Sequence, residues 1–446
     1  MSLIKNIISN RNISLVLCIS IPISFIVGNA AINILSLLIF LFFIINILKE
    51  KNLEFFKQKY IYLLFICYLF ILISLIFSNY ISTILFKSLI LFKIVILPVC
   101  FQYFFLKNSK RIVFFYTCFL VVLFVCFDAW IQYFFNLNLF GANITGINDT
   151  SRRISGIFFD EKILGSFIKI FSIFSFCYLI ILHKVKKINI FFPYLFYLIC
   201  FLTILITQER SSFLVFLLMT SLICVYMIYK DKKNMLFLIL PIIIISYLFI
   251  SDNYVKNRYI SSFSSGAGFG EVTYLKPKVF GDNNTSEPPI FNLRNVIKNF
   301  TIRDSLWGAH FVTATEIFKN NLFFGSGPRT FRYECSQKKY DKLKIKYINK
   351  RCSTHPHNFV FEILSELGIF GFISFLVTFV YIIYSRIKIF FKINSLTFNL
   401  IFLTFFMNNW PIATTGSLFS SQNIFINSLL LGLLFSYSER NLFNRS

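Results

Sequence analysis

The sequence is poor in charged residues, and in acidic residues above all. Asp, Glu, Lys and Arg make up 14% of its 446 residues, and only 19 acidic residues stand against 44 basic ones. A soluble domain is roughly one quarter charged. Apolar residues reach 57%, the mean hydropathy is +0.72, and the apolar residues come in long blocks. This composition excludes an ordinary soluble enzyme, a DNA-binding protein and a disordered tail. The long runs also exclude an outer-membrane β-barrel, whose strands alternate over short segments.

Several motifs are missing as well. No G-x-x-x-x-G-K-[ST] motif occurs, and Gly325-Ser326-Gly327 lacks the strand-to-helix context of a dinucleotide site, which disfavours ATP-driven transport. No A-x-A cleavage site follows the first apolar run, so we interpret that run as a retained helix. The chain has no internal repeat and its polar groups gather at the predicted outer ends of the spans. Both features disfavour a secondary transporter or flippase.

The apolar runs themselves predict the fold. A membrane-spanning helix needs about 20 mostly apolar residues, and the sequence predicts an all-α polytopic membrane protein with twelve spans. Its predicted parts are nine helices over 1–250, a loop domain over 251–357 and three helices over 358–446. The predicted spans are 13–28, 30–48, 60–78, 84–106, 112–135, 163–182, 189–206, 211–229, 235–250, 358–384, 395–414 and 421–437.

Basic residues predict the orientation of these spans. Alternate short loops carry clusters such as Lys184/Lys186/Lys187, whereas the opposite short connections have no Lys or Arg. Basic loops stay in the cytoplasm, so both termini are expected there. The loop domain then faces outward. It carries 17 Lys and Arg against 8 Asp and Glu over 252–351, which fits either an anionic substrate or generic solvation.

The outward loop has two further features. Its front part, 261–289, is rich in Gly, Ser and Pro, and a helix-like pattern follows over 302–320. Eight of the ten cysteines fall inside apolar spans, and only Cys335 and Cys352 lie in the loop. An oxidising periplasm favours a disulfide between these two. Closing a loop of about 17 residues contributes roughly 3 kcal/mol in the chain-entropy model.

Two histidines stand at the outer end of the predicted tenth span. His355 and His357 lie in Ser-Thr-His-Pro-His-Asn, and His is the side chain best suited to accept a proton near neutral pH. Pro356 between them is expected to turn His355 away. His310 is the only other outward histidine, and no ligand cluster has metal spacing, so no metal site is predicted. The alternative is a polar helix start at the headgroup level.

Charged residues accompany the histidines. Glu366 lies about two turns into the tenth span on the same face as Glu362, where an ionisable group needs a partner. The candidate partners are Arg210, Lys93 and Lys169. Three outward arginines, Arg153, Arg210 and Arg303, form a candidate cradle for a lipid-linked diphosphate, because the guanidinium fork matches phosphate oxygens.

These residues carry a resemblance to the bacterial O-antigen ligase family, which includes O-antigen polymerases. The family motif is His, then Asn, Ser or Gln, nine residues, Gly, two residues, and Gly, Thr or Tyr. Here it reads His357-Asn358, nine residues, Gly368, two residues and Gly371. Three further stretches are similar to family patterns, and the resemblance covers roughly residues 150–385. These stretches are Arg303-x-x-x-Trp307 with Gly325-x-Gly327, Arg153-x-x-Gly156 with Leu164-Gly165, and Arg210-Ser-Ser-Phe-Leu. The segment 261–289 has no counterpart.

The resemblance implies an inverting, metal-independent glycosyltransferase of the bacterial inner membrane, acting at its periplasmic face without a cofactor. The donor would be a polysaccharide on undecaprenyl diphosphate, and the acceptor a hydroxyl of lipid A-core or another glycan. His357 would deprotonate the acceptor, and Arg210, Arg303 and Arg153 would bind the diphosphate. His355, Asn358, Glu366, Gly368 and Gly371 would support the site.

Two other functions stay open at this point. An O-antigen polymerase shares the topology, the arginines and the donor, but takes a second lipid-linked glycan as its acceptor. A flippase or secondary transporter is the alternative from another class. Membrane lipid is an expected partner in every case, and nucleic acid is not.

Overall fold

The computed structural model describes residues 10–51, 54–106, 108–148, 151–230, 259, 305–392, 395–411, 414 and 416–437. The predicted ninth span, the segment 261–289 and Arg303 lie outside the described residues.

Helices make up almost all of the described regular structure. A backbone in lipid must satisfy its own hydrogen bonds, which a helix does within one segment. Eleven of the twelve predicted spans coincide with helices. They are α2 (Asn10–Val27), α3 (Asn29–Glu50), α4 (Lys59–Ile76), α5 (Ile81–Ile90) with α6 (Lys93–Phe104), α7 (Asn108–Phe135), α8 (Leu164–Lys184), α9 (Phe191–Ile206), α10 (Arg210–Lys230), α17 (Phe359–Lys392), α18 (Leu396–Asn408) and α19 (Ser421–Ser436).

Six stretches in the described residues are long and apolar enough to cross a membrane, and five shorter helices are also apolar. The six are Asn29–Glu50, Lys59–Ile76, Ile81–Phe104, Ser109–Phe135, Leu164–Lys184 and Phe359–Lys392. Large apolar side chains face outward from them: Phe86 is 79% exposed and Leu48 is 71% exposed. An apolar outer surface of this kind is what lipid requires.

Two predicted spans differ from single straight helices. The fourth is broken between α5 and α6, and the break leaves Lys93 Nζ 3.1 Å from Ser421 Oγ. The tenth, α17, continues to Lys392, beyond the predicted end at 384, and has a non-helical residue at Gly368. The extra turns contain Arg386, which lies beyond the predicted span. Its guanidinium lies over the Phe435 ring at 4.2 Å, a packing that long basic side chains allow at a helix end.

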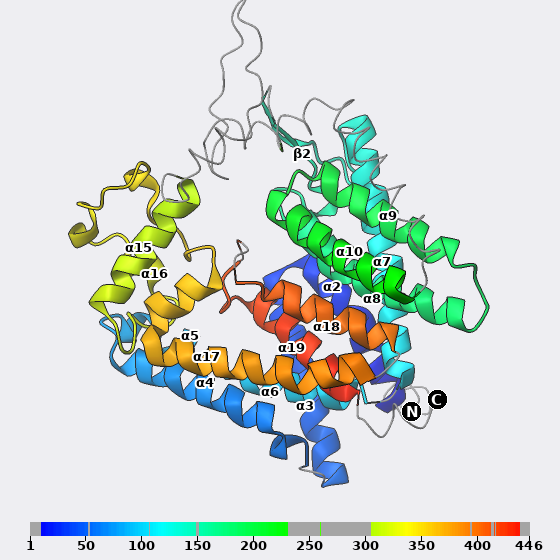
Figure 1. Ribbon diagram of the computed structural model, residues 1–446, viewed down its shortest axis with the longest axis horizontal. Coiled ribbons are helices and arrows are strands. Elements are labelled where there is room, and N and C mark those ends of the chain that lie inside the picture. The colour runs from blue at the N-terminus through cyan, green and yellow to red at the C-terminus, as the bar shows by residue number, and fades with distance from the viewer. Residues whose placement is uncertain are drawn as a thin grey trace, which may run out of the picture.

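The helices pack as a bundle around α18 and α19. In Figure 1, α17 runs alongside α4, and α7 to α10 group at the opposite side of the molecule. Helix α6 packs on α19, where a buried polar chain joins them: Tyr60 Oη donates to Gln102 Oε1 at 2.7 Å, and Gln102 Nε2 donates to the carbonyl of Phe435 at 3.0 Å.

The described part of the outward loop is a small helical unit. It contains α15 (Leu306–Asn320), α16 (Phe331–Glu334) and 3-10 turns over Lys338–Tyr340 and Ile348–Lys350. Ser305 caps α15 by accepting the Gly308 N–H at 2.9 Å, so the helix-like pattern is confirmed from residue 306. Figure 1 shows α15 and α16 beside the first turns of α17. Cys335 and Cys352 are joined there in a disulfide with a Cα–Cα distance of 5.4 Å, inside the range that a disulfide requires.

The all-α class has one exception in the described residues. A short antiparallel hairpin, β1 (Thr145–Asn148) and β2 (Ser151–Arg153), lies between α7 and α8. Gln132 of α7 fixes the chain that follows the hairpin, because its Oε1 accepts the N–H groups of Ser155 and Gly156 at 3.0 and 2.7 Å.

Candidate functional site

His357 lies in a cluster of rings just before α17. Its ring centroid is 4.2 Å from that of His355, 4.5 Å from that of Trp307 and 5.2 Å from that of His310. The backbone of His357 has φ 62°, in the left-handed region. A non-glycine residue in that region is strained, and such strain gathers at functional sites.

The expectation that Pro356 turns His355 away is wrong. His355 and His357 line one cavity and their rings are neighbours. The left-handed conformation of His357 turns the chain back, so that the two side chains point to the same side. Sequence spacing alone cannot show this, because it assumes ordinary backbone angles on both sides of the proline.

Burial changes the acid–base behaviour of His357. Loss of solvent, together with the smaller effects of the charges of His355 and His310, lowers its pKa to about 3. Burial also lowers the pKa of His310, whose Nδ1 lies 3.0 Å from the carbonyl oxygen of Arg351. His357 is therefore neutral near pH 7, with a ring nitrogen that can accept a proton.

A cavity of about 670 Å³ opens at His357. Four cationic side chains line it: Lys162, Lys169, Arg329 and Arg332, here called the cavity cations. Among the described residues that line it there is no Asp or Glu. A hollow with four cations and no carboxylate attracts an anion.

Part of the cavity wall is rich in side-chain amides. Asn408 Nδ2 and Asn409 Nδ2 both donate to Asn427 Oδ1, at 3.2 and 2.9 Å. These three residues, the amide cluster, stand where α18 ends and α19 begins, and all three line the cavity. Amides carry donors and acceptors side by side, which suits the hydroxyl groups of a sugar.

The motif glycine Gly368 produces the kink in α17. Its φ is 69°, and a Cβ there would lie 2.4 Å from the carbonyl carbon of Phe323. The backbone groups freed by the kink bond to the loop before α16: Ile369 N donates to the Leu322 carbonyl and Gly327 N to the Glu366 carbonyl, each at 2.9 Å. Gly371 follows on the same helix, where a Cβ would meet the Leu367 side chain at 2.3 Å.

Glu366 is fully buried and holds the loop before α16 against the kink of α17. Its carboxylate accepts the Arg329 N–H at 2.5 Å and the Phe331 N–H at 3.0 Å. The prediction that Arg210, Lys93 or Lys169 would be its partner is therefore wrong. A hydropathy pattern shows that a buried charge needs a partner, but it cannot show that backbone amides of a distant turn supply one.

Asn358 and Glu362 hold the loop between α18 and α19. Asn358 Nδ2 donates to the Pro411 carbonyl at 2.6 Å, and its Oδ1 accepts the Val360 N–H at 2.9 Å. Glu362 accepts the Leu418 N–H at 2.8 Å and the Ser417 hydroxyl at 2.5 Å. The motif that contains His357 thus also positions the amide cluster.

Residues 195–376 match the family model for O-antigen ligase. This part of the chain is therefore similar to an O-antigen ligase domain. The resemblance read from the motif is confirmed over these residues, and with the apolar helices it indicates a multi-pass membrane protein with an O-antigen ligase or polymerase type of function. The match covers less than half of the chain, and no curated protein matches it.

The O-antigen ligase domain supplies only part of the cavity. His355, His357, Arg329 and Arg332 lie inside the matched residues. Lys162, Lys169 and the amide cluster lie outside them and complete the cavity from α8, α18 and α19.

The predicted arginine cradle is only partly visible. Arg303 lies outside the described residues. The charge of Arg153 acts on Arg210, so the two lie within electrostatic reach of one another. Neither is among the residues lining the cavity, although Ser211 and Ser212, next to Arg210, are.

Glu209, beside Arg210, is tied to the start of α8. Its carboxylate accepts the N–H groups of Gly165 and Ser166 at 2.7 and 3.0 Å and the Ser212 hydroxyl at 2.9 Å. Burial raises the pKa of Glu209, and these hydrogen bonds oppose the rise. No group of three or more His, Cys, Asp or Glu in the described part of the chain is arranged to hold a metal ion.

Sequence reasoning missed Arg329, Arg332 and the amide cluster. Arg329 stands two residues after Gly327 of the Gly-x-Gly stretch, and that proximity was the one available signal. The amides of α18 and α19 meet only through helix packing.

Proposed function

We propose that the protein is an inner-membrane glycosyltransferase that moves a glycan from undecaprenyl diphosphate to a hydroxyl of lipid A-core at the periplasmic face. The observation that carries the proposal is the position of a neutral His357 in a cavity with four cations and no carboxylate among its described lining residues. The family match supports a glycosyltransferase-like enzyme in general.

In the proposed reaction His357 takes the proton of the acceptor hydroxyl. The acceptor oxygen then attacks the anomeric carbon of the donor glycan while the bond from that carbon to the diphosphate oxygen breaks. Attack from the face opposite the diphosphate inverts the configuration at this carbon. Undecaprenyl diphosphate leaves with the bonding electron pair.

Cationic side chains supply the stabilisation that this leaving group needs. Negative charge grows on the diphosphate as the bond breaks, and fixed cations in a water-poor site stabilise such charge strongly. The cavity cations, which line the cavity together with His357, would supply this stabilisation. Arg210, Arg303 and Arg153 are proposed to bind the diphosphate as well, so the step is proposed to need no metal ion.

Binding of the donor would also raise the pKa of His357. A diphosphate beside the imidazole favours its protonated form and raises its pKa from the low value of the empty site. Proton transfer from the acceptor hydroxyl then becomes easier when the donor is bound. The amide cluster would orient the hydroxyls of a sugar in the cavity.

The membrane location follows from the donor. With both termini in the cytoplasm, the ends of α8, α10, α17, α18 and α19 that line the cavity face the periplasm. The polyprenyl tail would lie between helices while its diphosphate reaches the cavity cations.

Transfer from purified undecaprenyl-diphosphate glycan tests the proposal. The full chain, in lipid nanodiscs with EDTA, is given either lipid A-core or a second lipid-linked repeat unit as acceptor. We expect transfer to lipid A-core, and loss of that transfer in His357→Ala. Transfer only to the second lipid-linked glycan would make the protein an O-antigen polymerase instead. No transfer to either acceptor would reject both.

A further inference from the structure

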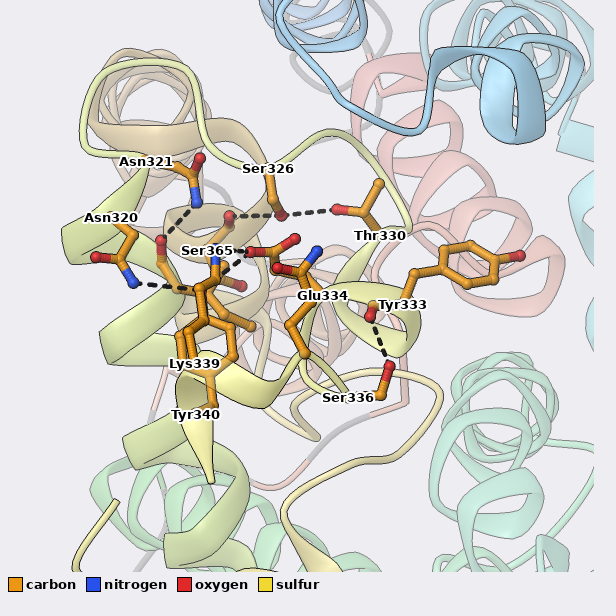
Figure 2. Close-up of polar contacts among 12 residues, drawn as sticks. Asn320, Asn321, Ser326, Thr330, Tyr333, Glu334, Ser336, Lys339, Tyr340 and Ser365 are labelled. Carbon is orange, nitrogen blue, oxygen red and sulfur yellow. Dashed lines mark hydrogen bonds and ion pairs between the residues drawn. The ribbon is translucent and has the colours of Figure 1, made fainter. Parts of the chain in front are cut away.

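The turn before α16 holds an arginine in a strained conformation. Arg329 has φ 61°, in the left-handed region that side chains other than glycine and asparagine rarely adopt. The turn is fixed from several sides. The Glu366 carboxylate accepts the Arg329 N–H at 2.5 Å, and Ser78 Oγ donates to the Ser326 carbonyl at 2.6 Å. Figure 2 shows the bonds of Ser326 to Thr330 and Ser365, at 2.7 and 3.1 Å.

The turn and the helix α16 that follows it present two guanidinium groups to the cavity. Arg329 and Arg332 both line it, together with His355 and His357. The Arg332 Nε atom is buried and has no hydrogen-bond partner in the described structure. A buried donor without a partner costs free energy, so its presence at a cavity wall calls for a ligand.

The carboxylates around the turn are already bound to other groups. The three ion pairs among the described residues join Glu316 to Lys319, Glu334 to Lys339 and Asp341 to Arg351. Glu334 also accepts the Tyr340 hydroxyl at 3.0 Å. Figure 2 shows Tyr340 beside Lys339. Glu362 and Glu366 accept backbone N–H groups, and their charges act on Arg329 only at longer range. Neither Arg329 nor Arg332 forms an ion pair with any of these acids.

A helix N-terminus adds to the positive charge. Ser420, Gln422 and Asn423, at the start of the 16-residue helix α19, line the same cavity. Lys93 Nζ reaches Ser421 Oγ at this end, and Arg329 lines the same cavity as Ser420. Helix N-termini and arginine forks are the two groups best suited to phosphate oxygens.

We propose that Arg329 and Arg332, together with the α19 N-terminus, bind the diphosphate of the donor next to His357. The inference rests on the proposed function, because it specifies which residues bind the leaving group. It adds a second arginine pair to Arg210 and Arg303, and it explains why the strained turn is held by Glu366.

Direct binding tests this assignment separately from catalysis. The full chain is titrated with undecaprenyl diphosphate, undecaprenyl monophosphate and inorganic diphosphate. We expect Arg329→Asn and Arg332→Gln each to weaken undecaprenyl diphosphate binding by about 10- to 100-fold, the range for a hydrogen bond to a charged group. Inorganic diphosphate should compete, because the site recognises the diphosphate rather than the lipid tail.

Lys319→Gln is the matched control. It removes one positive charge from the same unit, but Lys319 is exposed and pairs with Glu316 away from the cavity. Its binding should equal that of the wild type. An equal loss of binding in Lys319→Gln would show that the effect depends only on net charge and would overturn the assignment.

A second variant separates binding from folding. Arg329→Gly suits the left-handed backbone, so its melting temperature should equal or exceed that of the wild type while binding is lost. A lower melting temperature, or wild-type binding in this variant and in Arg332→Gln, would overturn the proposal. Diphosphate binding without any glycan transfer would keep this inference and reject the proposed function. A raised KM for the acceptor, with the donor KM unchanged, would assign the arginines to acceptor phosphates instead.

Discussion

The buried acids and the cavity cations are used in opposite ways. Glu209, Glu362 and Glu366 each accept hydrogen bonds from backbone N–H groups of a distant segment, and each joins two parts of the bundle. Arg329 stands on a turn fixed by one of these acids, and Arg332 lies in α16 directly after it, yet their side chains form no ion pair among the described residues.

This difference distinguishes structural charge from functional charge. A buried charge costs several kcal/mol unless it is paired and hydrogen-bonded. The acids meet that requirement with groups of the protein itself, so their role is complete in the folded chain. The arginines are held rigidly and have no ion-pair partner among the described residues, which is the arrangement that ligand binding needs.

The comparison is tested most strongly at Glu366. Glu366→Ala leaves the Arg329 and Phe331 N–H groups buried without acceptors, and each such donor costs about 1–3 kcal/mol. We expect a loss of about 2–6 kcal/mol of stability together with loss of transfer, measured by thermal unfolding in detergent and by the transfer assay. Glu366→Gln keeps one acceptor oxygen and should lose less. Wild-type stability in Glu366→Ala would contradict the structural role.

His357→Ala should affect the rate alone. General-base assistance accounts for about 10²–10⁴ in rate, and the half-buried ring contributes little to packing. The kcat for transfer should fall by that factor with an unchanged melting temperature. His355→Ala is the matched control and should lose less. Because its ring lies 4.2 Å from His357, the loss should nevertheless be measurable. Equal kcat in His357→Ala and wild type would remove His357 from the mechanism.

The disulfide between Cys335 and Cys352 stabilises the segment that carries Arg332. Cys335 follows α16 directly, so opening the bridge loosens the segment that carries Arg332. Removing it by Cys352→Ser should cost roughly 3 kcal/mol, seen as a lower melting temperature and a higher donor KM. Thiol labelling of unreduced, denatured wild-type protein should leave both cysteines unmodified. Free thiols at both positions would reject the bridge.

The amide cluster should show a smaller and different effect. Asn427→Ala removes the acceptor shared by Asn408 and Asn409, and a net neutral hydrogen bond contributes about 0.5–1.5 kcal/mol. We expect the KM of the acceptor to rise by roughly 3- to 10-fold while the KM of the donor stays constant. Ser221→Ala, at an exposed hydroxyl bonded to its own helix, is the control. A change in the donor KM instead would show that the amide cluster binds the donor glycan.

The smallest effect concerns pH. The pKa of His357 is lowered to about 3 by burial and by the neighbouring histidines, so the free enzyme keeps its base unprotonated well below pH 6.5. The acid limb of kcat/KM against pH should therefore lie below that of an ordinary histidine. His355→Gln removes one of the charges that lower this pKa and should move the limb upward. A limb at pH 6.5 in the wild type would show a solvated His357.

The sequence predicted the helices well because hydrophobic length is a local property. Eleven predicted spans match helices, and even the start of α15 was close to its predicted position. The exceptions are Gly368, where α17 kinks, and the break between α5 and α6. Each departure goes with a contact to another segment, Ile369 N with the Leu322 carbonyl and Lys93 Nζ with Ser421 Oγ, which the sequence pattern does not show.

The site residues that lie in one continuous motif could be predicted from the sequence. The segment from His357 to Gly371 is continuous, and its chemistry can be read from residue types. The partner of Glu366, the pairing of His355 with His357 and the roles of Arg329 and Asn427 depend on backbone angles and on helices far apart in the chain.

Length, apolar runs and the spacing of one motif thus determined that this chain forms apolar helices and that residues 195–376 resemble an O-antigen ligase domain. Only the tertiary structure decided which charges the protein neutralises itself and which it leaves facing a cavity. The reason is physical: a hydrophobic run needs only its own residues to form a helix in lipid, whereas the partner of a buried charge is whatever group the packed bundle brings within about 3 Å.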